Sequence, residues 1–233
     1  MMYVRNNNLL ECLRIEKKRP FPRTRLLYGG TFDPIHFGHI SIIQHLSRIL
    51  RLERFIILPN RILPKSFPTA NVQHRLKMIQ LALKNNPLFQ IDLREIQNKK
   101  FSYTIDTLRS FRSQIGWKMP LGFIIGEDIL SSIHTWFKWR EILQLCNLLV
   151  CKRGKNANYR IDPVVKDWIN RHRTKNKNNI FLVPYGTIYF VNNPFIQISS
   201  TEIRRRSMNN QDCKDLLPDR VLRYINKNKI YQK

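Results

Sequence analysis

The stretch LLYGGTFDPIHFGHISIIQHLSRILRLERFIILP, residues 26–59, decides the fold. Its first five residues are mostly apolar and end in two glycines, which predicts a short buried strand. Within residues 38–50, apolar side chains recur at the spacing of one helix face, at Ile40, Ile43, Leu46 and Leu50. Residues 54–59 form a second apolar run that stops at a proline, which predicts another strand. Strand, helix and strand in this order predict a parallel βαβ unit.

The rest of the chain continues to alternate short apolar runs with helical patterns. Further strands are predicted at QIDL (90–93), LGFIIG (121–126), NLLVC (147–151), IFLV (180–183) and IYFV (188–191). Further helices are predicted at residues 71–83, 103–116, 139–146, 164–173 and 218–228. The alternation predicts an α/β fold with a Rossmann-like, doubly wound parallel sheet and a helical carboxyl-terminal part. In such a sheet the ligand binds at the carboxyl ends of the strands, where the strand order reverses.

The 233 residues are expected to form a single domain at residues 25–233, preceded by a basic extension at residues 1–24. Disorder is one expectation for this extension. Its apolar centre is too short for a secretory signal, and Glu11 and Glu16 argue against a transit peptide. No apolar run in the chain approaches the roughly 20 residues that span a bilayer, so no membrane partner is expected.

The formal net charge of +25, taken alone, favours a nucleic-acid partner. The basic residues are scattered, however, and no zinc-finger, RNP-like or basic-heptad pattern accompanies them. We therefore expect no specific nucleic acid, and a basic nucleic-acid-binding protein stays a remote alternative. The four cysteines, Cys12, Cys146, Cys151 and Cys213, contain no CxxC pair, which fits a reducing cytoplasm.

The turn between the first strand and its helix has the features of an anion site. Glycines 29–30 end the strand and Gly38 opens the helix, so the main chain can approach a ligand closely at the helix N-terminus. His36 and His39 are three residues apart and, in the first turn of a helix, can donate to one phosphate. Two alternatives stay open: a tight turn with polar surface histidines, and a metal site that adds Asp33 to the two histidines.

Residues 29–39, GGTFDPIHFGH, resemble the GxFxPxHxGH signature of the nucleotidylyltransferase superfamily. The second signature of that superfamily has a counterpart in ISSTEIRRR, residues 198–206, where Ser199 and Glu202 also have the capping-box spacing of a plain helix start. A capped helix with Arg204 in its first turns would be a second phosphate-holding device, facing the first across the sheet. The resemblance implies a sheet of the nucleotidylyltransferase type.

From about Leu26 to the carboxyl terminus, the chain most resembles the bacterial nicotinate-nucleotide adenylyltransferases. The shared landmarks are IILPN, PK (64–65), RLKMIQLA, SYTIDTL, FIIGEDIL, TWFKWREIL, LLVCKR and LLPDRVLRYINKNKIY, and the departures are Phe101, Lys152 and Gly154. The resemblance implies an enzyme of NAD biosynthesis. It would transfer the adenylyl group of ATP to nicotinate mononucleotide, giving nicotinate adenine dinucleotide (deamido-NAD) and pyrophosphate. The alternative is an enzyme that uses nicotinamide mononucleotide, or both mononucleotides.

The resemblance also implies which residues carry this reaction. The catalytic residues would be His36, His39, Lys65 and Arg204. ATP would be bound by Gly29, Gly30, Thr31, Phe32, Gly126, Asp128, Ser199 and Thr201. Nicotinate mononucleotide would be bound by Tyr103, Thr104, Trp136, Phe137 and Arg153, with the indole of Trp136 stacked on the pyridine. The alternative for Lys65 is a solvated lysine in a loop. The alternative for TWFKW is ordinary packing in the core.

The acceptor phosphate is already an anion, so the implied reaction requires no general base. It requires in-line positioning of the reactants and compensation of the phosphate charge. Mg²⁺ is the expected cofactor, held by the phosphates of ATP and water rather than by protein ligands. The oligomeric state, a homo-oligomer included, stays open.

Overall fold

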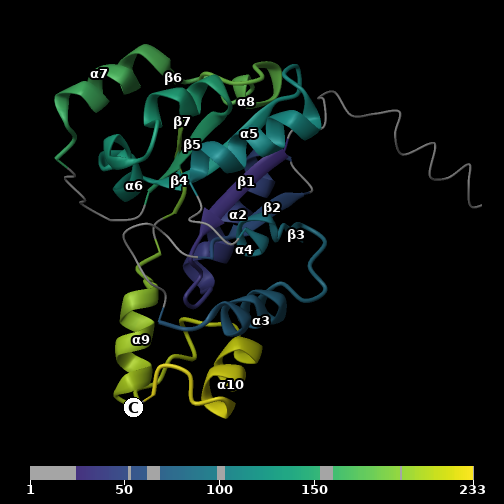
Figure 1. The fold of residues 1–233 in the computed structure, drawn as a ribbon. Helices are drawn as coiled ribbons and strands as arrows, with labels where there is room; N and C mark the ends of the chain where they lie inside the picture. Colours follow the sequence, from purple (N-terminus) through teal and green to yellow (C-terminus); the bar gives the residue numbers. More distant parts are fainter. Residues whose placement is uncertain are drawn as a thin grey trace, which may run out of the picture.

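The computed structural model of the protein describes residues 25–51, 54–61, 69–98, 103–152, 160–194 and 196–232. A seven-stranded sheet lies at its centre, with the strand order β3-β2-β1-β4-β5-β7-β6 (Figure 1). All neighbouring strands are parallel. The strands are β1 (Arg25–Gly30), β2 (Phe55–Pro59), β3 (Phe89–Ile91), β4 (Leu121–Gly126), β5 (Asn147–Cys151), β6 (Arg173–Thr174) and β7 (Ile188–Val191). The strand order reverses between β1 and β4, as a doubly wound sheet requires.

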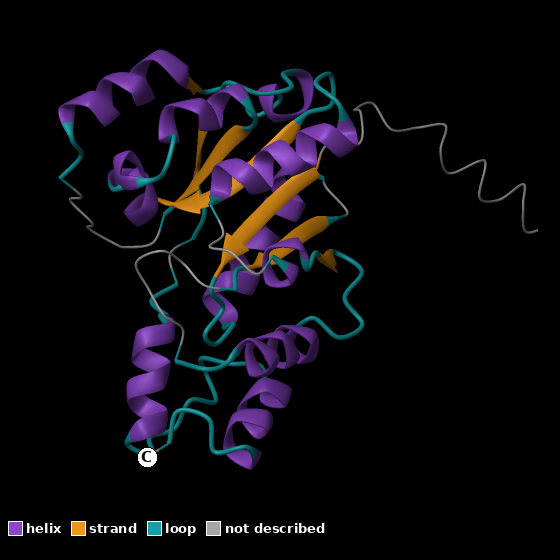
Figure 2. Ribbon diagram, viewed as in Figure 1, coloured by secondary structure: helices purple, strands orange, loops and turns teal. Residues whose placement is uncertain are grey.

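Helices cover both faces of the sheet, as Figure 2 shows. The α-helices are α2 (Phe37–Leu50), α3 (Val72–Ala82), α4 (Arg94–Gln97), α5 (Thr104–Ile115), α6 (Glu127–Ser131), α7 (Pro163–His172), α8 (Asn179–Leu182), α9 (Ser200–Met208) and α10 (Asp219–Lys227). Two 3₁₀-helices, η2 (Ile133–Thr135) and η3 (Trp139–Gln144), lie between α6 and β5. The predicted α/β fold class is therefore confirmed.

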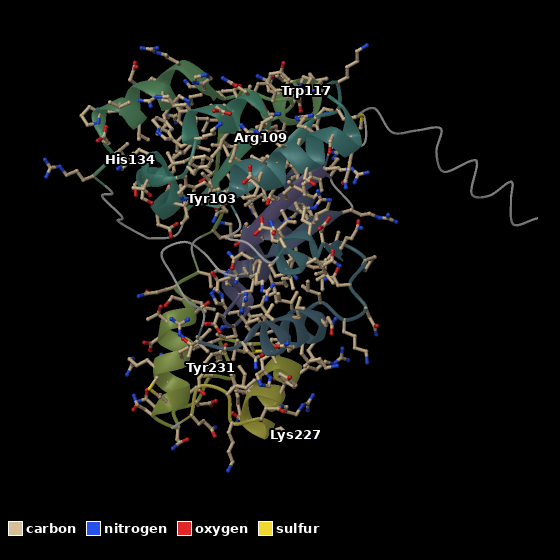
Figure 3. The ribbon with its side chains drawn as sticks, viewed as in Figure 1. Tyr103, Arg109, Trp117, His134, Lys227 and Tyr231 are labelled. Carbon is tan, nitrogen blue, oxygen red and sulfur yellow. The ribbon has the colours of Figure 1, made fainter. Side chains whose placement is uncertain are left out.

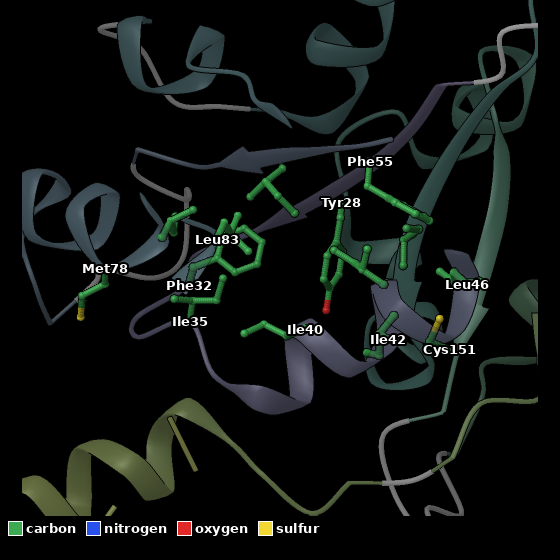
Figure 4. Close-up of a cluster of buried hydrophobic side chains, with 14 of the residues drawn as sticks. Tyr28, Phe32, Ile35, Ile40, Ile42, Leu46, Phe55, Met78, Leu83 and Cys151 are labelled. Carbon is green, nitrogen blue, oxygen red and sulfur yellow. The ribbon is translucent and has the colours of Figure 1, made fainter. Parts of the chain in front are cut away.

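The side chains of β1 alternate between two hydrophobic cores. Leu26 and Tyr28 belong to the cluster on the α2 side, which Figure 4 shows with Phe32, Ile35 and Ile40. Leu27 belongs to the opposite cluster with Leu108 and Phe111 of α5. Each fully buried side chain of this size contributes about 1.5–3 kcal/mol, so β1 is firmly held from both faces. The two glycines at its carboxyl end are thereby fixed in place.

Three helices, α3, α9 and α10, lie together below the sheet in Figure 1. Helix α10 packs against α3, and the Tyr224 hydroxyl lies 2.9 Å from Nδ1 of His74. Ile203 of α9 and Val221 and Ile225 of α10 extend the same core that contains α2. The helical carboxyl-terminal part is thus joined to the α2 face through continuous apolar packing.

Most predicted elements agree with the structure to within a few residues, but the strand predicted at residues 180–183 is wrong. These residues belong to helix α8, Asn179–Leu182. Phe181 N–H donates to the Asn178 oxygen at 2.9 Å, and Asn178 N–H donates to Oδ1 of Asn176 at 3.0 Å. A four-residue apolar run is too short for periodicity to distinguish strand from helix. The asparagine-rich turn before this run starts a helix. The position at the sheet edge beside β7 is taken by β6 instead.

Among the described residues, no helix has the length and apolarity to cross a membrane. Cys146, Cys151 and Cys213 are buried, and Cys12 lies outside the described residues. Burial raises the pKa of the Cys146 thiol well above its ordinary value. Its neutral thiol packs as a small apolar side chain in the core.

Candidate active site

A cleft of about 360 Å³ opens at the carboxyl ends of β1, β2 and β4, beside the point where the strand order reverses. It is lined by residues predicted to bind ATP and by residues predicted to bind the mononucleotide. The predicted residues that line it are Gly29, Gly30, Thr31, Phe32, His39, Thr104, Gly126, Trp136 and Arg204. The fold therefore brings together predicted residues that are up to 175 positions apart, from Gly29 to Arg204.

His36 and His39 form a tight pair at the start of α2. His36 is the N-cap residue of the helix, and its main-chain N–H donates to Nδ1 of His39 at 3.3 Å. The two rings stack with their centroids 3.7 Å apart, and the Phe32 ring packs edge-on against His39 at 5.1 Å. Because Nδ1 of His39 accepts a hydrogen bond, the neutral ring carries its proton on Nε2. Nε2 is then the donor that the ring of His39 offers to a ligand.

At two positions of the turn, neighbouring rings leave no room for a side chain, which requires glycine. A Cβ on Gly38 would lie 3.0 Å from the ring of His36, and a Cβ on Gly29 would lie 3.0 Å from the ring of Phe123. Phe32, which follows these strand-end glycines, has φ +49, a left-handed conformation that bulky residues adopt rarely. This backbone places the Phe32 ring, which is buried, under His39.

The N-terminus of α9 lies directly against the turn between β1 and α2. Ser200 donates from Oγ to the main-chain oxygen of Pro34 at 3.0 Å, and Arg204 donates from Nη1 to the main-chain oxygen of Asp33 at 2.7 Å. The expectation that the two phosphate-holding devices face each other across the sheet is therefore wrong. The two segments are in direct contact, because these hydrogen bonds join them.

Ser199 caps α9, since its hydroxyl accepts a hydrogen bond from the main-chain N–H of Glu202 at 3.2 Å. This confirms the predicted helix start. The Glu202 carboxylate accepts hydrogen bonds from Arg205 and Arg206, and these bonds lower its pKa to about 2. The charge of Glu202 is thus compensated by its own helix.

Asp33 is a buried carboxylate that lines the cleft, and protein donors occupy both of its oxygens. Oδ2 accepts from the Thr69 N–H at 2.7 Å, and Oδ1 accepts from the Ala70 N–H at 3.1 Å and the Tyr231 hydroxyl at 2.6 Å. Within the described residues, no group of three or more His, Cys, Asp or Glu side chains could hold a metal ion. The donor set at Asp33 is that of a structural carboxylate, which disfavours the alternative metal site with the two histidines.

Thr104 and Trp136 line the cleft, at the start of α5 and just after η2. Tyr103 is the N-cap residue of α5, and its ring lies 5.1 Å from the ring of Phe137. The Phe137 side chain is 52% exposed. Tyr103 and Phe137 are thus the sequence neighbours of two lining residues, and their rings pack on each other.

Six predicted residues are not among the described residues that line the cleft: His36, Tyr103, Asp128, Phe137, Ser199 and Thr201. Five of them are adjacent in sequence to a lining residue, and the sixth, His36, stacks on the lining residue His39. Asp128 is adjacent to Ile129, which lines the cleft, and its main-chain oxygen accepts from Ser131 within α6. Lys65 and Arg153 lie outside the described residues.

Asn60 and Glu95 also line the cleft, although the sequence did not predict them as site residues. Asn60 is buried, and its Oδ1 has no hydrogen-bond partner within the described part of the chain. Glu95 accepts from Thr107 Oγ1 at 2.7 Å, and burial raises its pKa although this hydrogen bond opposes the shift. Both residues follow a strand, β2 or β3, and the rule that ligands bind at the carboxyl ends of parallel strands was the signal available.

Comparison with known proteins adds to this geometry. Residues 27–206 match the model of the family described as cytidylyltransferase-like. A "Probable nicotinate-nucleotide adenylyltransferase" from Yersinia enterocolitica is 43% identical over 216 residues, which cover 92% of this chain and 98% of that protein. A protein of the same name from Pectobacterium atrosepticum is 41% identical and covers 91% of this chain and 100% of its own length. The chain belongs to the cytidylyltransferase-like family, within the nicotinate-nucleotide adenylyltransferases.

Solved structures have the same fold. The nicotinic acid mononucleotide adenylyltransferase of Plasmodium falciparum complexed with NaAD superposes with a TM-score of 0.68 at 19% identity, and the alignment covers 89% of this chain and 97% of that one. The same enzyme complexed with APC gives a TM-score of 0.67 at 20% identity and covers 89% of this chain and 96% of that one. At this identity the likeness establishes the fold, and the family membership rests on the closer sequence relatives.

Proposed function

We propose that this protein transfers the adenylyl group of ATP to nicotinate mononucleotide, releasing pyrophosphate and forming nicotinate adenine dinucleotide for NAD biosynthesis. One observation supports the proposal: a single cleft is lined by the glycine turn after β1, by His39 and Arg204, and by Trp136 and Thr104. The names of the sequence relatives support the same reaction. The residues 25–233 would act as one domain, and we place the enzyme in the cytoplasm.

The phosphate end of the cleft suits a nucleotide triphosphate. Nε2–H of His39 would stabilise the charge that grows on the α-phosphate as pyrophosphate departs. Arg204, together with the hydroxyls of Ser199 and Thr201 beside it, would bind the β- and γ-phosphates. The main chain of Gly29, Gly30, Thr31 and Phe32 would hold the nucleotide against the end of β1, with Gly126 and Asp128 on the adenosine side. His36 would support the ring of His39 by stacking, and Lys65 would add a cation.

The aromatic end suits the mononucleotide. The indole of Trp136 would stack on the pyridine ring, and the main-chain N–H groups near Thr104 and Phe137, next to Tyr103, would face its carboxylate. Arg153 would bind the phosphate of the mononucleotide. That phosphate attacks the α-phosphorus of ATP in line, the bond to the bridging oxygen of pyrophosphate breaks, and no proton has to be removed from the nucleophile.

Mg²⁺ would enter with ATP, bound by the phosphates and water. The carboxylates that line the described cleft fit this arrangement, because Asp33 and Glu95 already accept hydrogen bonds from protein donors. When bound, the ion would neutralise the charge of the departing pyrophosphate. The chain itself would contribute the fixed donors of His39 and Arg204.

The test is pyrophosphate release by the purified full-length protein. ATP should be combined in turn with nicotinate mononucleotide, nicotinamide mononucleotide and no acceptor, and CTP should replace ATP in a parallel series. We expect turnover with ATP and nicotinate mononucleotide, and a product with the mass of nicotinate adenine dinucleotide. Turnover only with CTP, or with neither mononucleotide, would refute the proposal.

A further inference from the structure

Tyr231, near the end of the described chain, reaches back to the cleft. Its hydroxyl donates to Oδ1 of Asp33 at 2.6 Å, across 198 positions of sequence. Figure 3 shows Tyr231 between the helices of the carboxyl-terminal part, and its side chain is 7% exposed. The backbone of Lys229 and of Tyr231 is left-handed, with φ +50 and +66, which non-glycine residues adopt rarely. Contacts around the tail therefore hold it in this course, among them the Ile230 N–H that donates to the Ile225 oxygen at 3.0 Å.

Asp33 is the point at which four separate segments meet. Its side chain joins the turn after β1 to Thr69 and Ala70 before α3, and to Tyr231 in the tail. Its main-chain oxygen accepts from Nη1 of Arg204 in α9 at 2.7 Å. The tail hydroxyl thus shares a partner with the arginine that lines the phosphate end of the cleft.

The distances between Arg204 and the oxygens of Asp33 indicate what the Tyr231 hydroxyl does. Nη1 of Arg204 lies 4.0 Å from Oδ2 of Asp33, whereas it lies 2.7 Å from the main-chain oxygen of the same residue. The carboxylate is turned towards Tyr231 and the two N–H groups. Removing the hydroxyl leaves Oδ1 of the buried carboxylate with the Ala70 N–H alone among the described donors, and the Arg204 guanidinium, whose Nη1 already lies 4.0 Å from Oδ2, is a charged donor close enough to replace it.

We propose that Tyr231 is a positioning residue for ATP: it holds the Asp33 carboxylate away from Arg204, so that the guanidinium keeps its direction and its charge for the triphosphate. The inference rests on the proposed function, which gives Arg204 its role in binding phosphate. A shorter, hydrogen-bonded Arg204–Asp33 ion pair would compensate the charge of the arginine and turn its guanidinium away from the triphosphate. The tail hydroxyl keeps the two charged groups at the 4.0 Å seen in the structure.

The hydroxyl is suited to this task over the whole range of enzyme assays. Burial, followed by the charge of Asp33, raises the pKa of Tyr231 well above its ordinary value. The group therefore stays protonated and remains a donor. Arg75, which is buried and donates to the Thr31 and Arg61 oxygens, lies near enough to Asp33 and Tyr231 to interact with both electrostatically.

The test is Tyr231→Phe, which keeps the ring in the apolar core and removes only the hydroxyl. We expect the KM for ATP, and the Kd of a non-hydrolysable ATP analogue measured by calorimetry without any acceptor, to rise roughly three- to tenfold, the usual range for one hydrogen bond. The KM for nicotinate mononucleotide should stay within about twofold, because Thr104 and Trp136 are untouched.

Tyr224→Phe is the matched control, since it removes another hydroxyl of the carboxyl-terminal part, bonded to His74 rather than to Asp33. It should leave ATP binding unchanged. Both variants should be measured at a temperature well below their melting midpoints, which circular dichroism supplies. A lower melting temperature with unchanged Kd and KM for ATP would mean that Tyr231 is merely structural, and would overturn the inference while leaving adenylyl transfer standing. A wild-type protein that neither binds the ATP analogue nor turns over ATP would overturn both.

Discussion

The main-chain N–H of His36 donates to Nδ1 of His39 over 3.3 Å, within the first turn of α2. This bond places the proton of the neutral His39 ring on Nε2. The ring is held on its faces and edge by His36 and Phe32, so that the direction of the Nε2–H bond is fixed before any ligand binds. A donor that is already oriented loses little free energy to reorganisation during the reaction.

His39→Ala should therefore lower kcat far more than it weakens ATP binding. The charge on the α-phosphate is larger in the transition state than in the ground state, so the lost donor acts chiefly there. We expect kcat to fall roughly 10²- to 10³-fold, the usual scale for one such donor, as measured by steady-state pyrophosphate release. His172→Ala, in α7, is the control and should retain wild-type kcat. Wild-type turnover in His39→Ala would remove this residue from the mechanism.

Gly38→Ala tests the close packing behind the histidine pair. The new Cβ would lie 3.0 Å from both Cε1 and Nδ1 of His36, so the ring has to shift and the stacked ring of His39 with it. Alanine also favours the helix by about 1 kcal/mol over glycine, so stability need not fall. We expect kcat to drop at least roughly tenfold, since small misplacements of catalytic groups are costly.

Gln44→Ala, on the exposed side of the same helix, changes helix propensity without touching His36 and is the matched control. Circular dichroism should show both variants folded. A Gly38→Ala enzyme with unaltered kcat would show that the histidine pair tolerates displacement.

The sequence predicted the parts of this site that depend on local patterns and could not predict those that depend on distant contacts. Gly29 and Gly30, His39 and the α9 cap all follow from short motifs with a physical reason at each position. The contact of α9 with the β1–α2 turn was missed, because nothing local states that Arg204 bonds to the Asp33 oxygen. The hydrogen bond between Tyr231 and Asp33 likewise depends on how the carboxyl-terminal tail folds back onto the cleft. The short helix α8 depends on the turn before it, which hydrophobic periodicity does not detect.

Arg112 is the clearest structural cation of the fold, at the edge of the sheet opposite the cleft. It is buried, and it donates to four main-chain oxygens, those of Gly116, Met119, Leu145 and Pro184. Arg112→Met would remove the guanidinium donor from the Gly116, Met119 and Leu145 oxygens, whereas the Pro184 oxygen keeps the Leu121 N–H, and each buried unsatisfied group costs about 1–3 kcal/mol. We expect the free energy of unfolding, from urea titration, to fall by roughly 3 kcal/mol or more.

Arg109→Met is the control on the same helix, because the Arg109 side chain is 43% exposed and its ion pair with Glu141 is a surface one. It should change the free energy of unfolding by less than about 1 kcal/mol. Activity per folded molecule should be retained in both variants, and an Arg112→Met protein of wild-type stability would contradict this interpretation.

Glu95 should give the stability of the protein a pH dependence of recognisable sign. Burial raises the pKa of this carboxyl in the folded state above its ordinary value. At pH values between the pKa of Glu95 in the unfolded chain and its higher pKa in the folded protein, the folded protein binds more protons than the unfolded chain. The contribution of Glu95 to the free energy of unfolding therefore falls as the pH rises through this window. In Glu95→Gln this contribution is absent, and the variant should gain stability relative to the wild type as pH increases from about 4 towards neutrality. Urea titrations at several pH values measure the difference, and a difference independent of pH would contradict the assigned shift.

Under the proposed function, substrate choice would depend on hydrogen-bond polarity where Trp136 and Thr104 line the cleft. Nicotinate and nicotinamide differ only in a carboxylate or a carboxamide, so stacking on Trp136 cannot distinguish them. A carboxylate offers acceptors alone, whereas the amide turns an NH₂ towards one partner. If the main-chain N–H groups near Thr104 and Phe137 face both oxygens, the amide sets two donors against each other. An unpaired buried polar group costs about 1–3 kcal/mol, and a lost charge-assisted bond adds to this.

We therefore expect kcat/KM for nicotinate mononucleotide to exceed that for the nicotinamide form by at least roughly tenfold to a few hundredfold. Trp136→Ala should reduce kcat/KM for both mononucleotides by similar factors, because stacking is indifferent to the substituent. Trp117→Ala is the matched control, since Trp117 is 59% exposed and lines a different hollow beside Arg112 and Tyr185. It should leave both values unchanged. Equal kcat/KM for the two mononucleotides would reject nicotinate selectivity and leave adenylyl transfer intact, whereas a Trp136→Ala enzyme that loses only one substrate would show that the indole takes part in the discrimination.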